Sequence, residues 1–256
     1  MGRRSFRRSE RCFVAEGTKA LAVAVAAGAP IESVYVDPTA VGPELQGILE
    51  SCLEGGGRVF DLDSGVLERV ADTVHPQPVL AVVADIDITL DELGRRGADL
   101  VVVCADVRDP GNMGTLLRAA EAAGVGGVIC CDGSVDVYNP KTVRASAGAI
   151  FELPVVSGGE VVSVLDVLAG WGLARVGTAV RRGQDYTEMD LRRPTALVLG
   201  NEASGLPPAV ESSIDEWASI PMAGRAESLN VGIAGAVMCF EATRQRRFGT
   251  PQESVS

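Results

Sequence analysis

The chain has 256 residues, is 46% hydrophobic and carries a formal net charge of −11 at pH 7. This composition predicts a soluble globular protein with a packed core, built as one large domain or two smaller ones. No stretch approaches the roughly 18 to 20 apolar residues of a transmembrane helix, and the arginines at 3–11 precede no signal-peptide pattern, so we expect a cytoplasmic protein that does not bind membranes.

The first third of the chain predicts a small α/β unit with its own core. We expect helices and strands in alternation, with helices at 16–28, 43–54 and 64–70 and strands at 33–37, 58–63 and 79–85. Glycines and arginines at 94–97 then interrupt the apolar pattern, which predicts a break at 90–99. We therefore assign residues 1–93, including a basic N-terminal tail, to a separate N-terminal domain.

The rest of the chain alternates near-continuous apolar strands with helices. We expect strands at 100–105, 126–132, 151–156, 173–180, 195–200 and 216–222, helices at 113–123, 140–147, 161–169 and 207–212, and a long closing helix that ends near Arg247. This pattern predicts a parallel sheet covered by helices on both faces. The second domain should span 98–248, and residues 249–256 should form a frayed tail.

Several common kinds of site are missing from the sequence. There is no G-x-x-x-x-G-K-[ST] and no G-x-G-x-x-G after a strand, which argues against phosphate-loop ATPases and ordinary dinucleotide-binding domains. The single histidine, His75, argues against H-E-x-x-H zinc sites and a Ser-His-Asp triad, and we predict no metal site. The six cysteines show no C-x-x-C spacing and should be buried reduced thiols.

The acidic net charge argues against nucleic-acid binding, because affinity for phosphates comes largely from lysine and arginine. Basic clusters soften this objection; they comprise Arg3, Arg4, Arg7, Arg8, Arg11, Arg181, Arg182, Arg192, Arg193, Arg244, Arg246 and Arg247. From charge alone, solvated basic faces are the simpler interpretation.

Polar residues follow three of the predicted strands, where helix N-termini and free N–H groups favour ligand binding. In the first junction, Asn112 fits a helix N-cap, and Arg118 can reach toward the N-terminal end of that helix to hold a phosphate or carboxylate. An exposed, ion-paired arginine is the commoner case.

The second and third junctions have the same layout. In the second, Gly200 directly follows a buried strand and Glu202 lies in the loop, where it could simply interact with the dipole of the next helix. In the third, Ser228 could cap the last helix while Asn230 lies in its first turn. Three such junctions suggest one composite site.

Taken together, NMGTLLRAAEAAG, LVLGNEASGL and IPMAGRAESLNVGIAGAV resemble the three signature motifs of the SpoU (TrmH-type) branch of the SPOUT RNA methyltransferases. The resemblance covers nearly all of residues 99–247. The front segment, FVAEGTKALAVAV with HPQPVLAVVAD, is similar to the small ribosomal-protein-like substrate-binding domain that many of these enzymes carry. Ala203, Gly232 and Pro78 depart from the usual pattern, but none of them replaces a polar catalytic group.

The resemblance implies a ribose 2′-O-methyltransferase that uses S-adenosylmethionine, acts on RNA, forms a homodimer and folds as an α/β protein with a deep trefoil knot. The catalytic residues implied by motif position are Asn112, Arg118, Glu202, Ser228 and Asn230. Those implied for the cofactor are Thr178, Leu199, Gly200, Asn201, Gly205, Ile220, Met222 and Leu229. Because a guanidinium stays charged, we expect Arg118 to clamp a phosphate or stabilise the developing alkoxide, not to act as a base.

Several alternatives stay open. The front domain favours 23S ribosomal RNA, including an antibiotic-resistance role, over transfer RNA. A non-catalytic RNA-binding or ribosome-assembly factor and an enzyme acting on a small acidic metabolite are the competing classes. Ile233, Val237 and Phe240 recur at helical spacing and could form a dimer interface, although core packing is the simpler interpretation.

Overall fold

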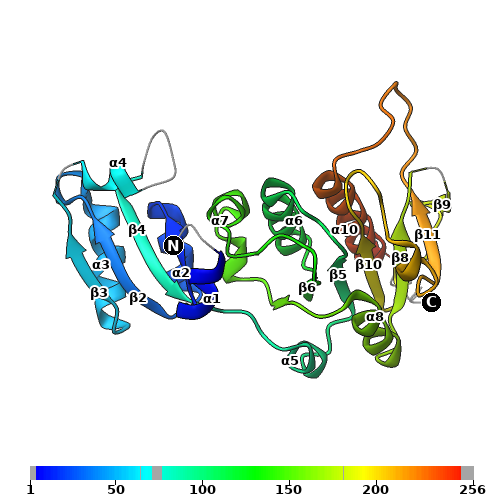
Figure 1. Ribbon diagram of the computed structural model, residues 1–256, viewed down its shortest axis with the longest axis horizontal. Coiled ribbons are helices and arrows are strands. Elements are labelled where there is room, and N and C mark those ends of the chain that lie inside the picture. The colour runs from blue at the N-terminus through cyan, green and yellow to red at the C-terminus, as the bar shows by residue number, and fades with distance from the viewer. Residues whose placement is uncertain (1–3, 64, 71–76, 181, 249–256) are drawn as a thin grey trace, which may run out of the picture.

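The computed structural model describes residues 4–63, 65–70, 77–180 and 182–248, which form two sheets with helices packed on them (Figure 1). The two sheets lie at opposite ends of an elongated molecule (Figure 1). Arg3, His75, Arg181 and the predicted tail at 249–256 lie outside the described residues. Within the described ranges, no helix is long and apolar enough to cross a membrane, and no group of three or more His, Cys, Asp or Glu side chains could hold a metal ion.

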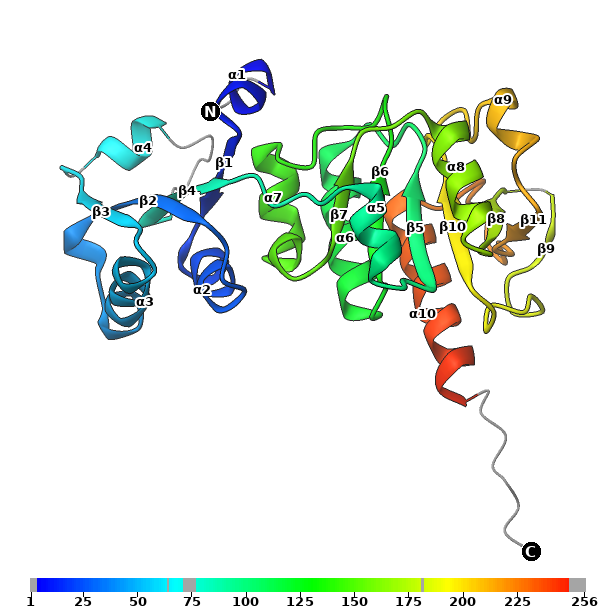
Figure 2. The ribbon, with the colours of Figure 1, turned by 90° about the horizontal axis from the view of Figure 1, so that it is seen from below.

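The N-terminal sheet has four strands of mixed direction. In spatial order they are β1 (Cys12–Glu16), β4 (Val79–Ala84), β2 (Ile31–Val36) and β3 (Arg58–Asp61). The helices of this part are α1 (Arg4–Glu10), α2 (Thr18–Ala26), the 3-10 helix η1 (Pro38–Ala40), α3 (Pro43–Glu54) and α4 (Val66–Val70). β4 is antiparallel to β1 and β2, whereas β2 and β3 are parallel. Buried residues alternate along β4, and α2 and α3 cover that face (Figure 2).

The start of this unit differs from the prediction. The predicted helix at 16–28 begins only at Thr18, because Glu16 ends β1 and Gly17 turns the chain with a φ of 100°. Neither α1 nor β1 was predicted, and the predicted helix included Glu16, which is the last residue of β1.

The predicted break at 90–99 contains a helix, α5 (Leu90–Arg95). A capping box between Thr89 and Glu92 starts it, and Leu93 is fully buried in the core of the second sheet. Gly94 is needed inside this helix because a Cβ there would overlap the ring of Trp171. The interruption of the apolar pattern is therefore a packing requirement, while the domain boundary itself stays a prediction.

The second sheet has seven strands, all parallel, as predicted. In spatial order they are β7 (Val155–Ser157), β6 (Gly127–Cys130), β5 (Leu100–Cys104), β10 (Thr195–Leu199), β8 (Ala174–Thr178), β11 (Glu216–Ser219) and β9 (Gln184–Asp185). Every residue of β5 and β10 is buried, as expected for central strands with helices on both faces. β9 is too short for the sequence pattern to reveal.

Helices cover both faces of this sheet. The further helices are α6 (Pro110–Ala122), α7 (Pro140–Ser146), the 3-10 helix η2 (Ala149–Phe151), α8 (Val161–Gly170), α9 (Pro208–Glu211) and α10 (Val231–Phe248). Residues of α6, α7 and α10 form one core with alternate strand residues, whereas α5, α8 and α9 form the other core. The α/β class with two helical layers is thus confirmed, and the knot stays a prediction of the resemblance.

The two parts of the molecule share one interface. Phe13 of β1 stacks on Tyr138 with ring centroids 4.4 Å apart and lies 5.9 Å from the ring of Phe151. Arg7 of α1 is buried and forms an ion pair with Asp136 at 2.5 Å. These contacts place the N-terminal sheet beside α7 and the segment that joins β6 to α7.

Candidate active site

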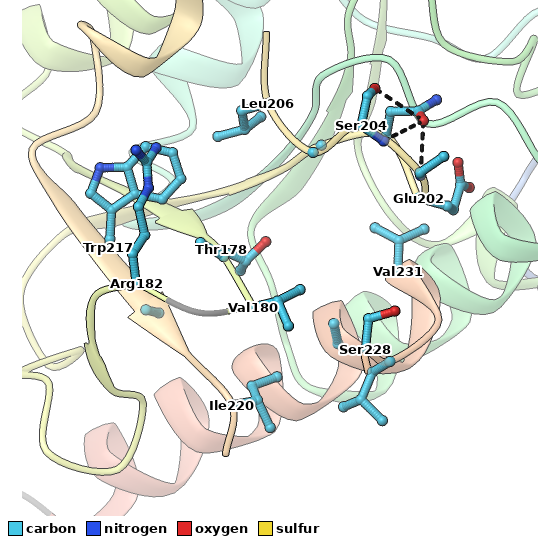
Figure 3. Close-up of a pocket in the computed structure, with 18 of the residues that line it drawn as sticks. Thr178, Val180, Arg182, Glu202, Ser204, Leu206, Trp217, Ile220, Ser228 and Val231 are labelled. Carbon is cyan, nitrogen blue, oxygen red and sulfur yellow. Dashed lines mark hydrogen bonds between the residues drawn. The ribbon is translucent and has the colours of Figure 1, made fainter. Parts of the chain in front are cut away.

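The loops that follow β8, β10 and β11 surround a cavity of about 570 Å³ (Figure 3). Because all strands of the sheet are parallel, the carboxyl ends of these three neighbours meet at one edge. The segment that leads into α10 closes the cavity from the side, with Ser228 and Val231 facing it (Figure 3). A cavity of this size suits a cofactor or a drug-sized ligand.

Asn201 shapes the loop after β10. Its backbone exchanges two hydrogen bonds of 2.9 Å with Gly205, and its side-chain oxygen accepts hydrogen bonds from the N–H groups of Ala203 and Ser204. Gly205 adopts a φ of 70°, which favours glycine. A Cβ at Gly200 would overlap backbone atoms of Gly205, so both glycines are needed for the tight turn.

Asp106, which follows β5, also holds the side chain of Asn201 in place. Asp106 has a φ of 70°, a conformation that aspartate tolerates better than most residues, and its carbonyl oxygen accepts a hydrogen bond of 3.1 Å from Asn201 Nδ2. The Asp106 carboxylate accepts a hydrogen bond of 2.7 Å from Arg108, which raises the pKa of that guanidinium. The sequence pattern gave no signal for Asp106.

Three of the predicted catalytic residues form one hydrogen-bonded chain. Asn230 Nδ2 donates to Asn112 Oδ1 at 2.6 Å, and Asn112 Nδ2 donates to Glu202 Oε1 at 2.9 Å. The residues come from the starts of α10 and α6 and from the loop after β10, so the chain joins all three predicted junctions. Glu202, for which an interaction with the next helix dipole was the simpler alternative, thus contacts Asn112 directly.

The helix caps differ from the prediction. Asp109 caps α6 by accepting a hydrogen bond from the N–H of Asn112, so Asn112 lies inside the first turn with its amide free to reach across the site. Asn230, and not Ser228, caps α10, because its Oδ1 accepts hydrogen bonds from the N–H groups of Gly232 and Ile233. The observed cap of α6 therefore lies three positions before the predicted one, and the observed cap of α10 lies two positions after it.

Ser228 and Arg118 do not take part in the hydrogen-bonded chain of Asn230, Asn112 and Glu202. Ser228 is exposed and lines the cavity. Arg118 is exposed on α6 and does not line the cavity, and its side chain forms neither a hydrogen bond nor an ion pair with any described residue. Its guanidinium is therefore free to meet a ligand from outside.

Seven of the eight predicted cofactor residues line the cavity; they are Thr178, Gly200, Asn201, Gly205, Ile220, Met222 and Leu229. Leu199 does not, because it is fully buried and its side chain lies beside Gly235 of α10. Within the described chain, the backbone N–H groups of Ile220, Met222 and Leu229 have no hydrogen-bond partner, so they are available to a ligand.

Most of the charged side chains that line the cavity are acidic. The charged side chains are Glu202, Glu211, Glu227 and Arg182. Arg182 and Trp217 lie at the end of the cavity opposite Glu202 (Figure 3). Glu211 lies beside Arg182, with which it forms an ion pair of 3.0 Å. The sequence analysis did not assign Arg182, Glu211 or Trp217 to the site: Arg182 and Trp217 lie outside the three junctions, and Glu211 lies beyond the loop that directly follows β10.

Comparisons with known proteins find relatives of both parts of the chain. The model of the SpoU rRNA methylase family matches residues 99–240, and that of the MRM3-like substrate binding domain matches residues 1–81. RlmP of Bacillus subtilis (strain 168), a 23S rRNA (guanosine(2553)-2′-O)-methyltransferase, is 35% identical over 192 residues, which cover 75% of each chain. RlmB of Ralstonia nicotianae, a 23S rRNA (guanosine-2′-O-)-methyltransferase, is 35% identical over 84% of this chain and 88% of its own.

A solved structure extends the similarity over both sheets. The SpoU methyltransferase AviRb from Streptomyces viridochromogenes, crystallised in complex with the cofactor AdoMet, superposes with a TM-score of 0.85 at 31% identity. The superposition covers 96% of this chain and 95% of AviRb.

Proposed function

The chain belongs to the SpoU rRNA methylase family, and we propose that it transfers a methyl group from S-adenosylmethionine to a ribose 2′-hydroxyl of 23S ribosomal RNA. The observation that carries this proposal is the Asn230–Asn112–Glu202 chain at the edge of a cofactor-sized cavity. Relatives named as 23S rRNA methyltransferases match both parts of the chain, which supports ribosomal RNA over transfer RNA.

The cavity fits S-adenosylmethionine. The three free N–H groups at Ile220, Met222 and Leu229 can recognise the adenine ring through the backbone, and Thr178 adds a hydroxyl. Carboxylates outnumber cations in the lining, which favours a ligand with a positive sulfur. When bound, the cofactor supplies a methyl group activated by that sulfonium.

The residues of this chain would position the ribose. Asn112 uses its side-chain oxygen and one N–H for Asn230 and Glu202, which leaves its second N–H for the RNA. Ser228 can donate to the ribose from the cavity wall, and Arg118 can hold the neighbouring phosphate and stabilise the developing alkoxide. Alignment of the hydroxyl with the methyl group can supply much of the rate acceleration.

We also propose that the protein acts as a cytoplasmic homodimer. Ile233 and Phe240 on α10 are 46% and 50% exposed, and Val237 between them is half-buried, so this stripe does not pack into the core of the chain. An exposed apolar stripe on a long helix is a common subunit interface.

The test is methylation with tritiated S-adenosylmethionine of unmodified 23S ribosomal RNA and, separately, transfer-RNA transcripts. We expect label on one position of the ribosomal RNA, resistance of that position to alkaline cleavage, and loss of at least about 100-fold in rate for Arg118→Ala. Arg192→Ala is the control, because Arg192 is also exposed but forms an ion pair with Asp190 outside the cavity.

Other outcomes would point elsewhere. Label only on transfer RNA would show that transfer RNA, and not 23S ribosomal RNA, is the substrate. Cofactor binding without label on free RNA or on ribosomal assembly intermediates would favour a non-catalytic assembly factor. Failure to bind S-adenosylmethionine at all would refute the proposal that the protein is a methyltransferase.

A further inference from the structure

The end of the cavity remote from Glu202 holds a pair of opposite charges that the proposed chemistry does not use. Arg182 Nη2 lies 3.0 Å from Glu211 Oε1, and Arg182 Nη1 donates to Glu211 Oε2 at 3.1 Å. Both side chains line the cavity, and they are 47% and 40% exposed. A surface pair of this kind contributes little to stability, so it can accept further partners at small cost.

Arg182 is the one cation among the described residues that line the cavity. A ligand with a carboxylate could therefore find a charged partner only at this end. Glu211 beside it offers the complementary partner for an ammonium group. The two side chains match the carboxylate and ammonium that a single carbon of an α-amino acid carries.

Trp217 holds the guanidinium in place. The Arg182 Cζ lies 3.4 Å from the centroid of a Trp217 ring (Figure 3). In this stacked geometry Nη1 and Nη2 face Glu211, and the Nε–H, which has no partner among the described residues, is left for a ligand. Trp217 itself packs against Gly177, where a Cβ would lie 3.0 Å from the ring. Gly183, with a φ of 101°, brings the loop against the backbone of Trp217, where no side chain would fit. A fixed guanidinium loses less entropy when it binds a carboxylate.

We propose that Arg182 and Glu211 form the subsite for the amino-acid end of the cofactor, with Arg182 binding the carboxylate and Glu211 the ammonium group. This inference rests on the proposed use of S-adenosylmethionine. It places the amino-acid end at Trp217 and leaves the Ser228 and Glu202 side for the RNA.

The test compares two ligands by isothermal titration calorimetry with the full chain. S-adenosylhomocysteine carries the amino-acid end, whereas 5′-methylthioadenosine lacks it but retains the adenosine and sulfur. We expect Arg182→Gln to raise the Kd for S-adenosylhomocysteine about 10-fold, because charge-assisted hydrogen bonds are lost, and to leave 5′-methylthioadenosine unchanged. Glu211→Gln should raise the first Kd about threefold and leave the second unchanged.

Arg192→Gln is the matched control, since Arg192 is exposed and paired with Asp190 but does not line the cavity. It should change neither Kd. Equal weakening of both ligands by Arg182→Gln would show that Arg182 only supports the pocket wall, and no weakening of either would remove it from the site; both results overturn the subsite. Absence of binding of either ligand to the unaltered protein would refute the proposed function as well.

Discussion

Asn112 connects two segments that lie 90 and 118 positions away in the sequence. Its amide accepts from Asn230 and donates to Glu202, so it fixes both neighbours relative to the first turn of α6. Such fixed polar groups are useful where a hydroxyl must be aligned with a methyl group. Asp109 makes this possible by capping the helix in place of Asn112.

We expect Asn112→Ala to lower the rate of methyl transfer roughly 10- to 100-fold, because the ribose and Glu202 lose their positioning partner. Cofactor affinity should change less than about twofold, since Asn112 does not line the cavity. Single-turnover kinetics and calorimetry measure the two quantities. Asn139→Ala is the control, because Asn139 is likewise a half-buried asparagine at a helix start, but it caps α7 and does not line the cavity. An unchanged rate would remove Asn112 from the catalytic set.

The cysteines give a second prediction about single residues. All six are buried and free, as predicted, and burial raises the pKa of Cys131 and of Cys239 to about 12. At pH 8 both thiols are therefore protonated and shielded, and thiolates are the reactive form. We expect a chromogenic disulfide reagent to titrate no thiol in the native protein and all six in denaturant. Rapid reaction before unfolding would contradict the buried positions.

At the scale of elements, α6 and α7 pack unusually close. Gly114 of α6 allows this, because a Cβ there would overlap Cβ of Ala145 and lie 2.7 Å from the carbonyl oxygen of Thr142. The same approach brings α7, and with it the contacts to β1, beside the helix that carries Asn112.

Replacing Gly114 by alanine should therefore lower the free energy of unfolding by about 1–3 kcal/mol through overpacking, despite the better helix propensity of alanine. Gly47→Ala is the matched control. Gly47 lies exposed within α3 with open space around it, so alanine there should raise stability by about 0.5–1 kcal/mol. Urea denaturation measures both. A stabilised Gly114→Ala would mean that the two helices can separate freely.

At the scale of the whole molecule, Tyr138 joins the two parts. Its hydroxyl oxygen accepts hydrogen bonds of 2.8 Å and 2.7 Å from the N–H groups of Ile86 and Asp87, and it donates to the Asp87 carboxylate at 3.0 Å. Burial raises the pKa of Tyr138 well above its usual range, so the hydroxyl keeps its proton across the physiological range.

We expect Tyr138→Phe to destabilise the protein by about 2 kcal/mol, because two N–H groups in the interface lose their acceptor. Tyr35→Phe should cost less than about 0.5 kcal/mol, since no described residue forms a hydrogen bond with the Tyr35 hydroxyl. Thermal unfolding followed by circular dichroism and calorimetry compares the two. Equal stability of both variants would mean that the hydroxyl does not hold the interface.

The proposed dimer gives a prediction at the same scale. Ile233→Glu combined with Phe240→Glu places two charges in the exposed stripe of α10 and should convert a dimer into a monomer, because burial of unpaired carboxylates is costly. Light scattering after size-exclusion chromatography measures the mass. The same double change at exposed Leu53 and Val167 should leave the mass unchanged. A monomeric unaltered protein would refute the dimer.

The sequence by itself determined the α/β class, the parallel second sheet and the three polar junctions. These features follow from local periodicity and from residues adjacent in the chain, such as Gly200 after β10 or Asn230 before α10. Local patterns did not predict the boundary where a strand passes directly into a helix, as at Gly17. They also missed the helix around Gly94, where glycine is required because the ring of Trp171 packs against it.

Only the tertiary structure decided which junction residues touch. The hydrogen bonds of Asn112 depend on strand order, which brings the ends of β5, β10 and the start of α10 together. The same order places Arg182 against Trp217 and leaves Arg118 without a partner among the described residues. Spacing along a chain cannot encode such contacts, because they depend on which strands become neighbours in the sheet.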